Sequence, residues 1–199
     1  YKDLAEPYGM PIDLVSTFDN EYTFVGNDGP MFFFKTDRDT PRRSLVAVDI
    51  RKPDPKDHQV LIDQRDETLT GVGLGGNLFV AHYLKDARTQ IRIHSMDGQF
   101  VREAEFPGIG TASGFGGRQS DTETFYSFAS FATPPSIFRY DMVTGQSTLW
   151  RQAKVKFQPD DYVVKQVFYS SKDGTKVPMF IAHHKDTKLD GKRPTLLYG

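Results

Sequence analysis

The chain of 199 residues has no cysteine, almost no net charge and no apolar run near the length of a membrane span. The absence of cysteine excludes disulfides, thiolate metal ligands and a cysteine nucleophile. A formal net charge of −1, with basic residues scattered among acidic ones, provides no field that would attract a nucleic acid or an anionic membrane. A membrane helix needs about 20 apolar residues in a row. We therefore expect no nucleic-acid or membrane partner. The absence of cysteine does not fix the compartment, for which we expect the cytoplasm, with the periplasm or secretion left open.

Helical periodicity is also nearly absent, and the sequence shows instead a repeat of about 46 residues. Apolar runs of one kind begin at positions 31, 78 and 125, and runs of a second kind begin at positions 44, 90 and 136. A further short strand is expected before and after each pair of runs. Four short strands per repeat are typical of a β-propeller blade, and we expect blades at about 15–64, 65–106 and 107–153.

Three blades cannot close a ring, since known propellers have about four to eight blades. Residues 1–14 are a candidate remnant of a fourth blade. The sequence also opens without an initiator methionine and without a basic-then-apolar leader. We therefore expect these residues to be an internal piece of a longer polypeptide.

The segment after residue 159 leaves the repeat. Asp173-Gly174 lies between the apolar runs 163–169 and 177–183, which predicts a β-hairpin because glycine accepts a positive φ without steric cost. A second turn signal, Asp190-Gly191, precedes Pro194 and the short apolar run 195–198. Such a run is typical of a fully buried strand.

Two stretches of this segment, SKDGTKVPMFI (171–181) and KLDGKRPTLLYG (188–199), resemble the opening of the catalytic domain in serine peptidases of the prolyl oligopeptidase family. The resemblance implies a mainly β chain. The last three blades of a seven-bladed β-propeller would occupy residues 1–154, and the first strands of an α/β-hydrolase domain would occupy residues 155–199. It also implies that Tyr198 and Gly199 lie beside the glycine-rich loop that helps to build the oxyanion hole. They would position this loop and have no catalytic role.

For the intact protein, the resemblance implies a serine endopeptidase that cleaves short peptides on the C-terminal side of proline and needs no cofactor or metal. Its Ser, Asp and His would lie beyond Gly199, so this chain would contain no catalytic residue and would be inactive alone. The propeller would limit the access of peptides to the active site. The partners would be short proline-containing peptides and the remainder of the same polypeptide. The alternatives are a sister peptidase similar to oligopeptidase B or acylaminoacyl peptidase, and a non-enzymatic propeller scaffold.

Two features, a nucleotide-binding pattern and a serine next to a glycine-rich stretch, could indicate a functional site but have a simpler structural interpretation. Residues 71–76 satisfy the nucleotide-binding pattern G-x-G-x-x-G, yet β-forming residues follow where that pattern needs a helix. We interpret them as the inner strand and turn of a blade, and the glycines of residues 114–117 occupy the equivalent place in the next blade. Ser113 lacks the G-x-S-x-G elbow that a nucleophile needs in this hydrolase fold.

The histidines and the aromatic runs also favour structural roles. His183 and His184 are adjacent on an expected strand, so they would point to opposite faces and could not easily bind one ion. The other three histidines, His58, His82 and His94, are isolated in the sequence. The aromatic runs 32–34 and 125–131 are in register with the repeat and are expected to form core between packed sheets.

Overall fold

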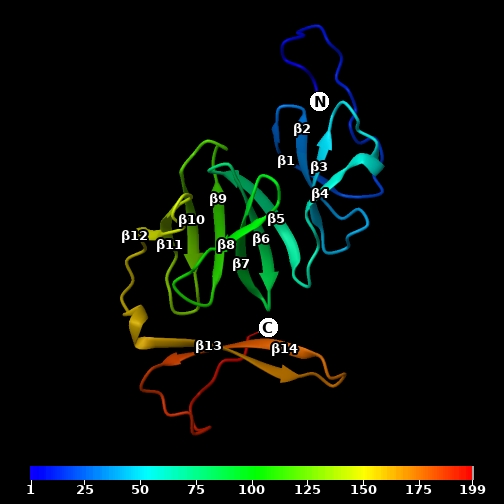
Figure 1. Ribbon diagram of the computed structural model, residues 1–199. Coiled ribbons are helices and arrows are strands. Elements are labelled where there is room, and N and C mark those ends of the chain that lie inside the picture. Colours follow the sequence, from blue (N-terminus) through cyan, green and yellow to red (C-terminus); the bar gives the residue numbers. More distant parts are fainter. Residues whose placement is uncertain (199) are drawn as a thin grey trace.

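In the computed structural model, which describes residues 1–198, three four-stranded antiparallel sheets are followed by a two-stranded hairpin (Figure 1). The first sheet contains β1 (Tyr22–Asp28), β2 (Met31–Thr36), β3 (Ser44–Asp49) and β4 (Gln59–Ile62). The second contains β5 (Thr68–Gly75), β6 (Leu78–Lys85), β7 (Arg88–Ser95) and β8 (Phe100–Glu103). The third contains β9 (Thr111–Gly116), β10 (Glu123–Ala129), β11 (Ser136–Asp141) and β12 (Ser147–Gln152). The hairpin contains β13 (Tyr162–Ser170) and β14 (Lys176–His184), and two short 3₁₀ helices lie at Pro55–Asp57 and Pro159–Asp161.

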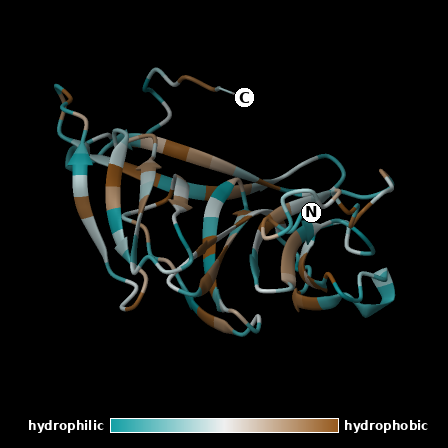
Figure 2. Ribbon diagram, turned by 90° about the horizontal axis from the view of Figure 1, so that it is seen from above, coloured by the Kyte–Doolittle hydropathy of each residue, from teal (hydrophilic) through white to brown (hydrophobic). Residues whose placement is uncertain are grey.

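Each four-stranded sheet is a meander in which every strand pairs with the next one in the chain. This is the arrangement of a propeller blade, and the three sheets are called blades 1, 2 and 3 below. Apolar and polar residues alternate along several of the strands (Figure 2), because successive side chains of a strand point to opposite faces. The prediction of a mainly β fold built from propeller blades is confirmed.

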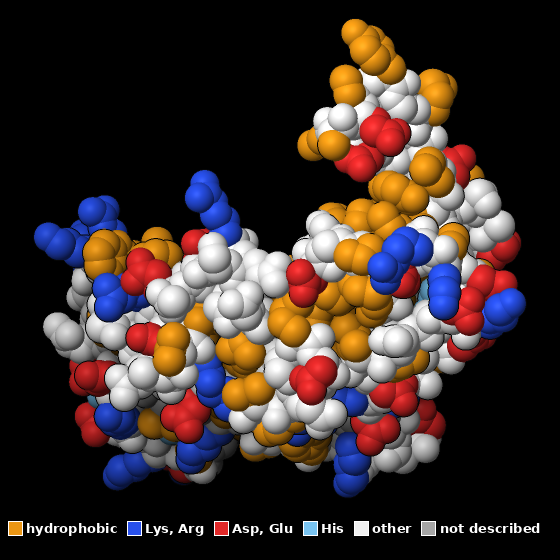
Figure 3. Space-filling model, turned by 45° about the horizontal axis from the view of Figure 1, so that its top comes forward, with side chains coloured by type: hydrophobic (Ala, Val, Ile, Leu, Met, Phe, Trp, Pro, Cys, Tyr) orange, Lys and Arg blue, Asp and Glu red, His pale blue; other side chains and the backbone are white. Residues whose placement is uncertain are grey.

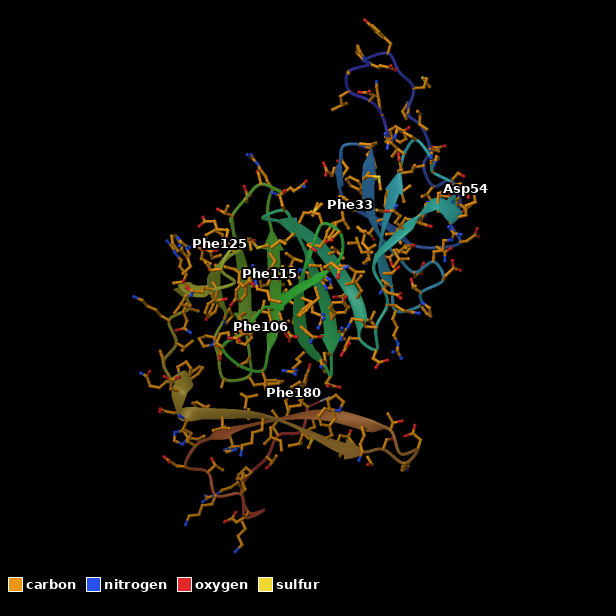
Figure 4. All side chains as sticks on the ribbon, in the orientation of Figure 1. Phe33, Asp54, Phe106, Phe115, Phe125 and Phe180 are labelled. Carbon is orange, nitrogen blue, oxygen red and sulfur yellow. The ribbon has the colours of Figure 1, made fainter. Side chains whose placement is uncertain are left out.

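Neighbouring blades are joined by two apolar clusters. One cluster unites blades 1 and 2, with the rings of Phe33 and Phe79 5.0 Å apart in an edge-to-face arrangement. The other unites blades 2 and 3 around Phe115, whose ring stacks on that of Tyr126 at 4.6 Å. Figure 4 shows Phe106 beside Phe115 in this region. Each interface buries large aromatic side chains, which contribute strongly to the stability of a core.

The two outer flanks of the three-blade set carry exposed apolar side chains. Phe125 and Trp150 of blade 3 are 41% and 58% exposed and pack against each other, with 5.7 Å between their rings. On blade 1, Phe24 packs against Phe32 at 5.5 Å and is itself 53% exposed. Figure 3 shows apolar side chains gathered on the surface beside the protruding N-terminal segment. That segment, residues 1–21, forms no strand, although the ring of Tyr1 lies 5.7 Å from that of Phe32.

The aromatic runs are therefore core only in part. Phe33, Phe34, Tyr126 and Phe128 are buried as expected. Phe125 lies on the opposite face of β10, which is the free flank of blade 3. Phe131 follows the end of β10 and is 70% exposed. Assigning both of these residues to the core was wrong. Phe125 is exposed because no described sheet covers its face of blade 3, and Phe131 is exposed because it lies in the loop that follows β10.

The hairpin confirms the turn predicted at Asp173-Gly174. Its strands pair without a register shift from Tyr162↔His184 to Ser170↔Lys176, and Gly174 has a φ of +86°. The strand predicted at residues 195–198 is absent, and the side chains of Leu196 and Leu197 are 91% and 85% exposed. A fully buried strand needs a partner strand and two covered faces, and no described strand runs beside this segment.

No helix within residues 1–198 has both the length and the apolar character that crossing a membrane requires.

Candidate functional site

The two residues expected to lie nearest to a catalytic site, Tyr198 and Gly199, are the last two of the chain. Tyr198 has no regular secondary structure and its side chain is 91% exposed. Gly199 lies outside the described residues. The positioning role expected for this pair therefore stays a prediction. What the structure does describe is the surface on which the preceding hairpin sits.

The hairpin lies across one end of blades 2 and 3 (Figure 1). This end of the three blades, called the hairpin face below, carries the β2–β3, β6–β7 and β10–β11 loops. The side-chain amide Nε2 of Gln166 in β13 donates a hydrogen bond of 2.5 Å to the carbonyl oxygen of Asp86 in the β6–β7 turn. The ring of Phe180 in β14 lies 5.7 Å from that of Phe131 in the β10–β11 loop. In Figure 4, Phe180 lies on the side of the hairpin that is toward the blades.

An ionic network holds the hairpin face of blade 1. The carboxylate of Glu21 accepts hydrogen bonds from Nζ of Lys35 at 2.9 Å, from Oγ1 of Thr23 at 2.9 Å and from Nε of Arg43 at 2.8 Å. These hydrogen bonds lower the pKa of Glu21 to about 2, and the one from Lys35 has the largest effect. Nζ of Lys35 also lies 3.3 Å from the carbonyl oxygen of Thr70 in blade 2, so the network links two blades.

A cleft of about 620 Å³ opens beside this network, where the β2–β3 loop of blade 1 meets the β4–β5 link. Its lining is strongly charged and includes Arg42 and Asp66, which form an ion pair of 3.2 Å, and Arg65 and Glu67, which form another of 3.1 Å. A charged, open cleft can bind or steer a polar ligand. Its described lining has no serine, cysteine or histidine, so it offers no nucleophile paired with a base.

The glycines of residues 71–76 serve packing. They end β5 and turn directly into β6, so no helix follows them. A Cβ on Gly73 would lie 3.1 Å from the carbonyl oxygen of Phe115, and one on Gly76, whose φ is +59°, would lie 2.7 Å from Cβ of Met142. Both contacts are with blade 3. The interpretation as the inner strand and turn of a tightly packed blade is confirmed.

Ser113 is an ordinary strand residue of β9. Its hydroxyl lies 2.9 Å from that of Ser127 on the paired strand β10, and both are exposed. A hydroxyl partner cannot act as the general base that a serine nucleophile requires.

The histidines are dispersed as expected. His82 lies between blades 2 and 3 with its ring 5.9 Å from that of Phe115, and burial lowers its pKa to about 4. Nδ1 of His183 lies 2.8 Å from the carbonyl oxygen of His184, while Nδ1 of His184 lies 3.6 Å from a carboxylate oxygen of Asp186. Within residues 1–198, no three His, Cys, Asp or Glu side chains come together in a way that could hold a metal ion.

Sequence reasoning missed the contacts that seat the hairpin. Gln166 and Asp86 are 80 positions apart, and neither belongs to a motif. Phe131 was assigned to the core, although its exposure after the end of β10 leaves it available to the hairpin. The signal in the sequence was only indirect: it is an aromatic side chain, Phe131, two positions after the last residue of β10.

Comparisons with known proteins agree with this arrangement. Residues 1–153 match the family described as "Prolyl oligopeptidase, N-terminal beta-propeller domain". The chain is 41% identical over 187 residues to the prolyl endopeptidase of Elizabethkingia meningoseptica, covering 94% of this chain and 26% of that protein. It is 33% identical over 203 residues to the dual function macrocyclase-peptidase POPB of Amanita bisporigera, covering 100% of this chain and 28% of that protein.

Solved structures give the same result. The apo form of prolyl oligopeptidase B from Galerina marginata aligns with a TM-score of 0.80 and 33% identity, over 89% of this chain and 26% of that one. A prolyl endopeptidase structure aligns with a TM-score of 0.78 and 36% identity, over 88% of this chain and 26% of that one. The chain thus spans about a quarter of the length of the curated relatives it matches.

Proposed function

This chain belongs to the prolyl oligopeptidase family, and we propose that it is part of a serine endopeptidase that cleaves short peptides on the C-terminal side of proline. The proposal rests on the family match over residues 1–153 together with the hairpin that leaves the repeat and docks against one end of the blades. A peptidase of this kind would take short proline-containing peptides as substrates. The remainder of its own polypeptide would supply the other blades and the catalytic groups.

We propose a division at residue 154. Residues 1–154 would be the last part of the propeller, and residues 155–199 would begin the α/β-hydrolase domain, with Tyr198 and Gly199 beside the oxyanion loop. A Ser nucleophile, a His base and an orienting Asp would lie beyond Gly199 in sequence. Within the described residues, the propeller would contribute gating: it would limit access to the site while the hairpin fixes the blades relative to the catalytic sheet.

The proposal is tested by kinetics on the complete natural polypeptide. A fluorogenic peptide with proline before the scissile bond should be hydrolysed with a kcat/KM at least about tenfold above that of matched peptides with arginine there or with an acylated N-terminus. This preference corresponds to about 1.4 kcal/mol of transition-state binding. Equal or higher rates on the arginine or acylated peptide would favour the sister peptidases instead. Residues 1–199 expressed alone should hydrolyse none of the three peptides.

The non-enzymatic scaffold would require the propeller repeat to continue after β12. The described residues of this segment form a two-stranded hairpin rather than another four-stranded blade, which argues against that alternative. Absence of all peptidase activity in the complete polypeptide would restore it. We keep the cytoplasm as the proposed compartment, and cell fractionation would distinguish it from the periplasm or secretion.

A further inference from the structure

His82 of β6 lies where blades 2 and 3 meet, a region called the blade 2–3 joint below. Its side chain shares one face of blade 2 with Val80 and Ile91, because it lies two positions from Val80 and pairs with Ile91 across the sheet. Val80 and Ile91 belong to the apolar cluster that blade 3 completes. The ring of His82 lies 5.9 Å from that of Phe115 in β9, in an edge-to-face arrangement. A side chain that can become charged is therefore set among apolar side chains of two blades.

The strands next to His82 place no acidic side chain on its face. β5 and β9 contain no ionisable residue. The ionisable residues of β6 and β7 alternate with the positions that face blade 3, so they point toward blade 1: Tyr83, Lys85, Arg88, Arg92 and His94. His94, whose pKa is lowered by burial, therefore acts on the other side of the blade.

The charged side chain that does share this face is a cation. Arg102 of β8 pairs with Ile93, so it points toward blade 3. Its Nε donates a hydrogen bond of 3.2 Å to the hydroxyl of Tyr140, and its Nη2 donates to the carbonyl oxygen of Met142. A positive charge on His82 would add to that of Arg102 instead of neutralising it.

Blade 3 provides no counter-charge for His82 within the described residues. Glu123 and Asp141 pair across β10 and β11 on the side of Phe125, which is the free flank of this blade. The side chain of Glu105, in the β8–β9 link, is exposed. Tyr126 faces blade 2, but its hydroxyl donates a hydrogen bond of 3.0 Å to a serine of β12, and burial raises its pKa, so it stays neutral.

Protonated His82 would thus be a cation without a partner in an apolar interface. Burial lowers the pKa of His82 from the ordinary value of 6.5 to about 4, so the closed joint favours the neutral ring. The stability that follows is fully present above about pH 6.5 and is lost as the pH falls toward 4. The residue is only half-buried, so a proton can reach it from solvent.

Backbone amides that cross the joint can report its opening. The N–H of Ala112 in β9 donates to Oγ1 of Thr89 in β7 at 3.0 Å, and the N–H of Thr89 donates to the carbonyl oxygen of Gly110 at 3.3 Å. Across the joint between blades 1 and 2, the N–H of Leu69 donates to the carbonyl oxygen of Arg42 at 3.0 Å. Each of these amides loses its partner when its own joint opens, which exposes it to hydrogen exchange.

We propose that His82 makes the blade 2–3 joint acid-sensitive: when the ring takes up a proton it leaves its apolar contacts for solvent, and the two blades separate at this joint. The proton comes from solvent and returns to it when the pH rises, so the change is reversible. Histidine suits such a switch because its charge changes in mildly acidic solution. The inference concerns the blades alone and is independent of the proposed peptidase activity.

The test is residue-resolved hydrogen exchange of the complete natural polypeptide at pH 7.5 and pH 5, expressed as protection factors so that the intrinsic pH dependence of exchange cancels. In the wild type, the opening constant reported by the amides of Thr89 and Ala112 should rise at least about tenfold from pH 7.5 to pH 5, as a pKa lowered from 6.5 to about 4 requires. His82→Phe keeps an aromatic ring beside Phe115 but cannot take up a proton, so this rise should be absent. His58→Gln, at a half-buried histidine of blade 1, is the matched control and should respond as the wild type does.

Three results would overturn the proposal. The first is a wild-type protein in which Thr89 and Ala112 have the same protection at both pH values, and the second is an unchanged rise in His82→Phe. The third is a response at Leu69 that disappears with His82, because it would show that the histidine acts on the whole fold and not on this joint. If His82→Phe does not fold, His82→Gln, which is also unable to take up a proton, replaces it with the same expected result.

Discussion

Phe131 and Phe180 come from parts of the chain with different architecture, and their rings lie 5.7 Å apart. Phe131 belongs to the β10–β11 loop of blade 3, and Phe180 to the second strand of the hairpin. With the hydrogen bond from Gln166 to Asp86, this contact links the hairpin to two blades at once. A two-stranded hairpin is at best marginally stable alone, so these contacts should decide how firmly it is held.

Removing the aromatic contact should loosen the hairpin without disturbing the blades. Phe131→Ala should lower the local stability of β13 and β14 by about 1 kcal/mol, the typical value of such an aromatic pair. Hydrogen exchange followed by mass spectrometry should show faster exchange in residues 162–184 and unchanged exchange in β5–β7. Phe125→Ala is the control, since Phe125 packs against Trp150 and not against the hairpin. Equal exchange of the hairpin in both variants would show that the contact contributes nothing.

The Glu21 network should make blade 1 sensitive to acid. The folded pKa of about 2 lies below the ordinary value of 4.5, so the ionised form is favoured by folding. This stabilisation is fully present above about pH 4.5 and is lost as the pH falls toward 2. Glu21→Gln should therefore be less stable than wild type at pH 6, and the difference in free energy of unfolding should close between pH 4.5 and 2. Denaturant unfolding of both proteins between pH 6 and pH 2 measures this difference in free energy. Glu6→Gln, at an exposed site, is the control. A difference that is independent of pH would contradict the network.

Local signals in the sequence predicted the strands well. The repeat and the Asp173-Gly174 turn were recognisable because both depend on neighbouring residues, through alternation and through the positive φ of a glycine. The β6–β7 turn carries no such signal, since Asp86 and Ala87 adopt φ values of 48° and 61° without any glycine. Propensity would not place alanine there.

Contacts between blades could not be predicted in the same way. Tyr83, Gln90 and His94 are buried because these three polar side chains share a face that blade 1 covers, and which blade covers a strand is a tertiary property. For Leu196 and Leu197 the error is the reverse, because burial was predicted and both side chains are exposed. Their apolar pattern predicts burial, but burial also needs partner strands that the described residues do not supply.

The β6–β7 turn should accept glycine with a gain in stability. A left-handed conformation costs a non-glycine residue about 1–2 kcal/mol, whereas glycine loses about 0.5–1 kcal/mol in conformational entropy. Ala87→Gly should therefore stabilise the protein by up to about 1 kcal/mol and raise its Tm. Ala182→Gly, at an exposed position of β14 where φ is not positive, should be destabilising. A loss of stability in both variants would mean that the turn is not strained at Ala87.

Gly98 offers the sharpest test of how blades 1 and 2 pack. It adopts a φ of +87°, and a Cβ there would lie 2.0 Å from the carbonyl oxygen of Leu61. Gly29 also has a positive φ, of +53°, but a Cβ on it would meet nothing within 4 Å. Gly29→Ala should therefore cost only the backbone strain of about 1–2 kcal/mol. Gly98→Ala adds a collision with the backbone of blade 1, which has no flexible side chain to move aside.

Comparing the two glycine variants separates the energetic cost of backbone strain from the cost of a collision between blades. Gly98→Ala should lower the free energy of unfolding by at least about 1 kcal/mol more than Gly29→Ala, in the range seen for overpacked interiors. Because Gly98 follows β7 and lies against Leu61 of β4, its variant should also accelerate hydrogen exchange in β4 and β7, whereas Gly29→Ala should affect only the β1–β2 turn. Equal losses in the two variants would mean that the β7–β8 turn does not press against Leu61. Blades 1 and 2 would then be held together by the apolar cluster around Phe33 and Phe79 and by the hydrogen bond from Lys35 to Thr70, without a contribution from this turn.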